Sequence, residues 1–161
     1  MIMKKILIIV LALTLNIAAY AQSGKSIYNK YSDEKDVNAV YISPAMFRIM
    51  GGIPDISMGK DDVNLSLVIK DLNAFYLIDS ENKEVNESLK KDIDRMLNNK
   101  FEMLMEVKSD GTNVHLYTVG DEKTVTNLIM TVSEEDECVF MSLEGSMPRE
   151  ELTEILTEAC K

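Results

Sequence analysis

The chain carries one histidine, His115, together with many carboxylates. A single histidine excludes the paired-histidine zinc motifs and leaves little material for catalysis by a nucleophile and a base. In the alternating segment 113–119, His115 falls on the side that also carries Asn113 and Tyr117, which is the more polar side. This position favours a solvated strand histidine over a catalytic one.

Carboxylates offer a second kind of chemistry, because two of them flanking a cleft run glycoside hydrolysis and several together hold calcium. The local spacings fit neither site. The segment Asp61-Asp62-x-Asn64 lacks the glycine and the later glutamate of a calcium loop, and Asp92 and Asp94 on a helix diverge by about 200°. The acidic run 134–137 is typical of a solvated turn. The sequence therefore predicts no metal, no cofactor and no catalytic residue, and it leaves open a hydrolase whose carboxylates come from distant segments.

Apolar residues around a glycine pair form the candidate site for a partner. Gly51-Gly52 matches neither a dinucleotide-binding nor a phosphate-binding loop, so we expect a flexible connection there. The apolar side chains on both sides of it follow neither a helical nor a strand period. A partner-binding patch and a mobile flap that covers the core explain them equally well. The residues that carry the partner-binding prediction are Met46, Phe47, Met50 and Ile53, with Ile49 and Met58 beside them.

Methionine is frequent, with 11 residues in the chain. Methionines can form soft copper ligands or an adaptable binding surface, but most of these fall at positions typical of a core. Met96 lies on the apolar stripe of a predicted helix, and four further methionines alternate along predicted strands. We therefore expect core packing for Met96, Met103, Met105, Met130 and Met141.

The first 21 residues have the features of a cleavable secretory signal peptide. Lys4 and Lys5 precede an apolar run, Ile6 to Leu15, and small residues lead to a predicted cleavage site after Ala21. A membrane anchor is the competing interpretation, but the run is shorter than the roughly 20 residues that span a bilayer. Because Gln22 stands where a lipoprotein has its acylated cysteine, the sequence predicts export without a lipid anchor.

Residues 22–161 have the length of a single domain. The formal net charge of −10 argues against nucleic acid and anionic membranes as partners, since both attract clustered basic residues. Export would place Cys138 and Cys160 where a disulfide survives. The sequence does not bring the two together, so a bridge and two free thiols both remain open.

Periodicity and turn residues predict an α+β fold, in which two helix–strand units precede an antiparallel β-meander of about four strands and a C-terminal helix. Asp110-Gly111 supplies hairpin turn chemistry within the meander. The strand 74–78 is apolar throughout, so we expect it inside the sheet. The other predicted elements are a strand at 37–43, helices at 61–72 and 87–98, strands at 101–108, 113–119, 124–132 and 139–143, and a helix near Pro148.

Three stretches of the chain carry a resemblance to a known family. They are Tyr28-Asn29-Lys30-Tyr31 followed by residues 40–46, then residues 72–81, and then residues 101–111. In these stretches the chain resembles the domain of unknown function 4252 family of small exported bacterial proteins. The resemblance implies export, a shared fold and a role in sensing at the cell envelope, and it implies no catalytic residue.

Together these observations favour a non-enzymatic exported domain that binds another protein, or a small ligand, in the periplasm or outside the cell. The alternative is an exported hydrolase whose carboxylates are brought together by the fold. A pocket lined by convergent carboxylates would favour the enzyme, and a flat apolar patch would favour binding.

Overall fold

The computed structural model describes residues 24–51, 71–97 and 99–159. The predicted signal peptide, the predicted helix from residue 61 to residue 70, and Ile53 lie outside these residues. In chain order the described elements are α2 (Gly24–Tyr31), β1 (Val37–Ile42), α3 (Pro44–Gly51), β2 (Leu72–Ser80), α5 (Lys83–Met96), β3 (Glu102–Ser109), β4 (Thr112–Gly120), β5 (Thr124–Ser133), β6 (Cys138–Pro148) and α6 (Arg149–Ala159).

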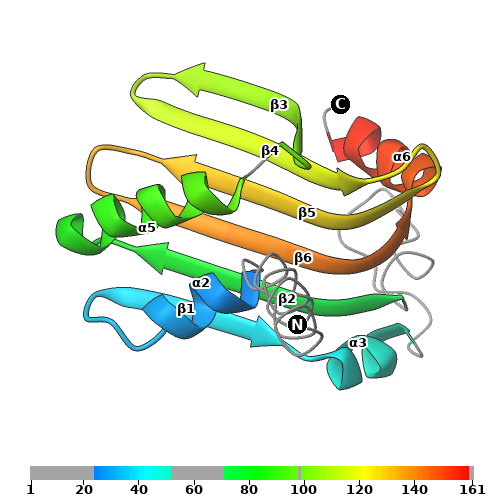
Figure 1. The fold of residues 1–161 in the computed structure, drawn as a ribbon, viewed down its shortest axis with the longest axis horizontal. Helices are drawn as coiled ribbons and strands as arrows, with labels where there is room; N and C mark the ends of the chain where they lie inside the picture. The colour runs from blue at the N-terminus through cyan, green and yellow to red at the C-terminus, as the bar shows by residue number, and fades with distance from the viewer. Residues whose placement is uncertain (1–23, 52–70, 98, 160–161) are drawn as a thin grey trace, which may run out of the picture.

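The six strands form one antiparallel sheet in the order β1-β2-β6-β5-β4-β3. Strands β3 to β6 are a meander, and β6 then pairs with β2, as Figure 1 shows. The α+β prediction, with its meander and C-terminal helix, is therefore confirmed. The prediction that the segment 74–78 lies inside the sheet is also confirmed, because β2 has β1 on one side and β6 on the other.

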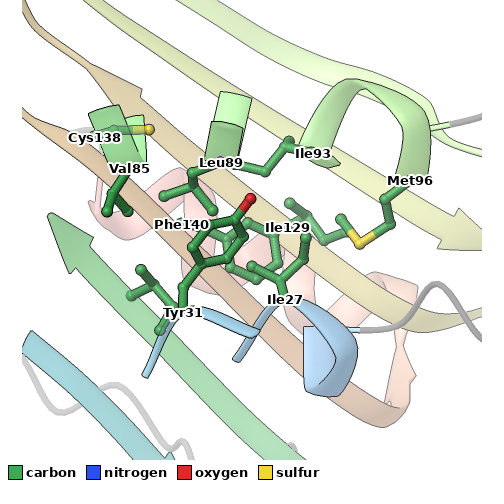
Figure 2. Close-up of a cluster of buried hydrophobic side chains, with 10 residues drawn as sticks. Ile27, Tyr31, Val85, Leu89, Ile93, Met96, Ile129, Cys138 and Phe140 are labelled. Atoms are coloured by element: carbon green, nitrogen blue, oxygen red, sulfur yellow. The ribbon is translucent and has the colours of Figure 1, made fainter. Parts of the chain in front are cut away.

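One face of the sheet is covered by α2 and α5, and we call it the helical face (Figure 1). Ile78 of β2 and Phe140 of β6 are direct partners across the sheet, and both are fully buried. Leu89 of α5 and Ile27 of α2 belong to the same apolar cluster (Figure 2). Burial of apolar side chains from two helices and three strands in one cluster makes this the main core of the domain.

Helix α5 follows the predicted apolar stripe but begins four residues before the predicted start at 87. Asn82 caps it, because the Asn82 side-chain oxygen accepts hydrogen bonds from the backbone N–H groups of Glu84 and Val85. The early start adds Val85 to the buried stripe. Three of the side chains predicted to face the core do so, namely Leu89, Ile93 and Met96, and Leu97 is partly buried beside them.

The opposite face of the sheet carries a second apolar cluster at one end. Residues from α3, β2 and α6 meet there, with Phe47, Leu72 and Leu152 among the buried side chains. Leu72 opens β2, so the prediction that this residue ends a helix is wrong. Helix α3 replaces part of the loop expected around the glycine pair, because Ser43 accepts a hydrogen bond from the Met46 N–H and Pro44 suits a first helical turn.

The predicted hairpin of β3 and β4 is present, with Asp110 and Gly111 at φ values of 47° and 88° as a tight turn requires. Every residue of β3 is nevertheless exposed. The prediction of core packing is therefore wrong for Met103 and Met105, which are 50% and 39% exposed, and right for Met96. The cause is that β3 is the last strand of the sheet, whereas α2 and α5 pack over β2, β5 and β6.

Met130 and Met141 fall between these extremes, since both are half-buried. They are direct partners on β5 and β6, on the face opposite α2 and α5. The prediction of core packing is therefore met only in part for both. The degree of burial depends on what covers that face, which alternation does not encode.

A polar contact joins α2 to α5 at the edge of the main core. The buried Tyr31 hydroxyl donates a hydrogen bond of 2.7 Å to the Asp92 carboxylate, which also contacts Lys30 and, at 3.1 Å, Arg95. The ammonium group of Lys30, followed by the Tyr31 hydroxyl and the Arg95 charge, holds the pKa of Asp92 below its ordinary value. The ionised form of Asp92 therefore stabilises the folded state.

We expect Asp92→Asn to lower the free energy of unfolding at pH 7 by about 1 kcal/mol, because the buried tyrosine loses a charged acceptor. Since the folded pKa is depressed, this contribution is fully present above the unfolded pKa and disappears as the pH falls through the folded pKa. Urea unfolding from pH 7 to pH 2.5 should show the two proteins converging at the acid end. Asp94→Asn, on an exposed position of the same helix, serves as the control, and an equal loss there would contradict the assignment.

Candidate functional site

Eight large apolar side chains are exposed among the described residues, and they fall at the two opposite edges of the sheet. One group lies on β1 and α3, and the other lies on β3. Exposed apolar groups gathered in this way are typical of interaction surfaces. The first group contains Val40, Tyr41, Met46 and Ile49, and the second contains Met103, Leu104, Met105 and Val107.

The apolar residues of α3 lie partly in the core and partly on the surface. Phe47 is only 4% exposed and packs in the cluster with Leu72 and Met147. Met46 and Ile49 are 47% and 61% exposed, and a spacing of three places them side by side on a helix. We call Met46 and Ile49 the α3 patch. Phe47 fixes the helix against the sheet, so the patch is held on a rigid element.

The four residues of the partner-binding prediction are thus placed differently. Met46 lies on the surface, and Phe47 lies in the core. The backbone of Met50 belongs to α3, its side chain lies outside the described structure, and so does all of Ile53. Sequence reasoning gave Ile49 a secondary place because it treated the segment as a loop, whereas the helical period makes Ile49 the neighbour of Met46.

Strand β3 presents the second group, which we call the β3 strip, namely Met103, Leu104, Met105 and Val107. Its pairing with β4 shifts register between Met103 and Met105, so Leu104 sits at a bulge. From Met105 to Ser109 the pairing is regular. On its outer side β3 has no neighbouring strand among the described residues, so its backbone is available for pairing there.

Charged side chains accompany the β3 strip. Glu106 Oε1 lies 2.9 Å from Lys108 Nζ and 3.0 Å from His115 Nε2. The Lys108 ammonium, and then His115, lower the pKa of Glu106. His115 is partly buried, and its ring stacks on Tyr117. Tyr117 packs against the main core, so His115 lies on the helical face of the sheet, where its ring nitrogen contacts a carboxylate of the neighbouring strand.

Glu144 is a partly buried carboxylate on β6. Burial raises its pKa, although the Gly24 backbone N–H at 3.0 Å and the Ser142 hydroxyl at 3.5 Å donate hydrogen bonds to it. Gly24 opens α2, so Glu144 binds the start of that helix to the sheet. A Cβ atom at Gly24 would stand 2.4 Å from Ser142, which explains the glycine there.

The described cysteine and the acidic side chains offer no reactive or metal-binding site in the described part of the chain. Cys138 is a free and buried thiol, and burial raises its pKa, which disfavours the reactive thiolate. Cys160 lies outside the described residues. Across residues 24–51, 71–97 and 99–159, no group of three or more histidine, cysteine, aspartate or glutamate side chains is placed to hold a metal ion.

These features define an α+β domain on an antiparallel sheet, with apolar side chains exposed at both edges. The sequence model described as "Domain of unknown function (DUF4252)" matches residues 31–155. The chain belongs to this family, which confirms the resemblance seen in the sequence. No curated protein matches the chain. Of the helices that the structure describes, none has the length and apolar character needed to cross a membrane.

The opposite placement of Phe47 and Met46 gives a direct prediction. Phe47→Ala should lower the free energy of unfolding by about 3–5 kcal/mol, because it removes a buried aromatic ring and leaves a cavity. Met46→Ala should change the free energy of unfolding by less than about 0.5 kcal/mol, as expected at the surface. Urea unfolding monitored by circular dichroism measures both. Equal losses from the two substitutions would contradict the placement of α3.

Proposed function

We propose that this chain is an exported domain of the bacterial envelope that binds another protein through the α3 patch. The supporting observation is the exposure of Met46 and Ile49 on a helix anchored by the buried Phe47. Binding energy at protein interfaces concentrates in a few apolar or aromatic side chains held in a fixed position. A patch on an anchored helix meets this requirement without a costly ordering step.

The edge strand β1, which leads into α3, exposes two further apolar side chains, and as neighbours in a strand they point to opposite faces of the sheet. Val40 and Tyr41 are exposed there, and the Tyr41 ring stacks on Tyr76 with 5.2 Å between centroids. Tyr28 packs against both rings, so the exposed tyrosine is held in place. Aromatic residues and methionine are enriched in protein interfaces, and a pre-ordered tyrosine loses little entropy when a partner binds.

The charge of the chain narrows the class of partner. A formal net charge of −10 disfavours nucleic acid and anionic lipid surfaces, so a protein is the best-supported partner. The predicted leader, which ends at Ala21, supports export as the route to the envelope. A binding role outside the cytoplasm is also consistent with a contribution to envelope sensing, which the family resemblance implies.

Site-directed photo-crosslinking in the native envelope tests this function. A photo-reactive residue at position 49 should give a discrete adduct with one partner, and the same residue at Glu135, exposed in the turn between β5 and β6, should not. The partner identified from the adduct should then bind the purified domain. The double substitution Met46→Asp and Ile49→Asp should weaken that binding at least tenfold and leave the melting temperature within a few degrees.

The matched control places the same charges at the other edge of the sheet. Met103→Asp with Leu104→Asp changes two side chains that are comparably exposed, and it should leave binding of this partner intact. Loss of binding in both double variants, or in neither, would refute the α3 patch.

The cleaved leader gives a separate prediction. The mass of the protein purified from the native envelope should show a chain that begins at Gln22. A mature chain that retains Lys4 and Lys5 would refute export through a cleaved leader.

A further inference from the structure

The open edge of β3 has a defined set of free backbone groups. Ser109 and Thr112 flank the two-residue turn, and the two residues next to such a turn form a hydrogen-bonded pair. Hydrogen-bonded and non-hydrogen-bonded pairs alternate along an antiparallel ladder. Val107 therefore directs its N–H and C=O toward β4, whereas Glu106 and Lys108 direct theirs toward the open edge.

We propose that two copies of this chain pair through β3, as antiparallel strands related by a two-fold axis at Val107. In this register Glu106 of one copy lies opposite Lys108 of the second copy, and both residues have their backbone groups on the open edge. Each such pair can exchange two hydrogen bonds across the interface. The free backbone groups of the strand are thus self-complementary about Val107, and the two sheets become one.

The side chains are self-complementary in the same register. Glu106 of each copy faces Lys108 of the other copy, so the interface contains two pairs of opposite charges. Within one copy these two side chains already contact each other at 2.9 Å, so pairing would join four alternating charges. Oppositely charged residues that face each other across strands stabilise a sheet, and like charges destabilise it. This charge pattern favours a second copy over an unrelated strand.

The apolar residues of β3 gain cover from the same pairing. Val107, which is 45% exposed, would face Val107 of the second copy across a pair without hydrogen bonds, where side chains approach most closely. Val107 and Met105 pair with Val114 and Leu116 of β4, so all four share one face of the sheet. Pairing would join this apolar face to its equivalent in the second copy.

The structure also explains why the association would stop at two copies. The bulge at Leu104 interrupts the regular edge, so the ladder is restricted to residues 105–109. A two-fold interface uses the same surface of both copies and leaves no second β3 edge for a third. Five residues in each strand form a short ladder, so we expect a dimer that dissociates on dilution.

Sedimentation velocity over a concentration series tests the pairing. The protein from Gln22 to Lys161 should show a reversible monomer–dimer equilibrium. Val107→Lys places two like charges at the two-fold axis and should raise the dissociation constant at least tenfold. Val40→Lys changes a valine of similar exposure, 42%, on the opposite edge strand and should leave the dissociation constant unchanged.

Charge exchange tests the register itself. Glu106→Lys alone and Lys108→Glu alone each create two like-charge pairs and should weaken self-association about tenfold, with circular dichroism showing an intact fold. A mixture of the two variants should form a heterodimer at least as readily as the unchanged protein forms its homodimer. A monomer at all concentrations, a dimer insensitive to Val107→Lys, or a mixture that associates no better than either variant alone would overturn the proposal.

Discussion

The pairing of β2 with β6 is the constraint on which the rest of the structure depends. It joins the N-terminal part of the chain to the last strand of the meander, and its partners Ile78 and Phe140 are both fully buried. Helices α2 and α5 pack over this junction through Ile27 and Leu89. Because the two halves of the sheet meet there, β1 and β3 become its edges.

Both exposed apolar surfaces follow from this strand order. β1 leads into α3 at one edge, where Phe47 anchors the helix and leaves Met46 and Ile49 outside. β3 lies at the other edge, farthest from the junction, and all of its side chains are exposed. The domain thus combines a stable centre with two separate surfaces, one suited to a protein partner and one suited to a second copy. The two proposals rest on different physical features: side-chain packing at α3 and backbone pairing at β3.

Much of the fold could be predicted from local patterns. Helix α5 has an apolar stripe on a polar background, and the turn at Asp110 and Gly111 requires the φ values that it has. Helix α3 was missed because it is short and almost wholly apolar, so a helical period cannot stand out from it. The exposure of Met103 and Met105 was missed for another reason. Alternation places the two on one face, but the bulge at Leu104 puts them on opposite faces, and the position of β3 at the edge of the sheet leaves both exposed.

The sequence predicts the candidate site but does not separate its surface residues from its core residues. Met46 and Phe47 are adjacent apolar residues, and only the phase of the helix separates a surface residue from a core residue. Within α3, Phe47 covers the core and Met46 is exposed, so the helix contains side chains that suit each of the two interpretations. The self-complementarity of β3 likewise required the register with β4, which shows which backbone groups are free.

Native-state hydrogen exchange, followed residue by residue, tests most directly the claim that the β2–β6 pairing is the centre of stability. At a concentration where the protein is monomeric, the amides of Ile78 and Phe140 should exchange slowest and only through global unfolding, and those of Glu106 and Lys108 should exchange fastest among the strands. Exchange of Ile78 and Phe140 through local opening, at rates like those of β3, would contradict the account.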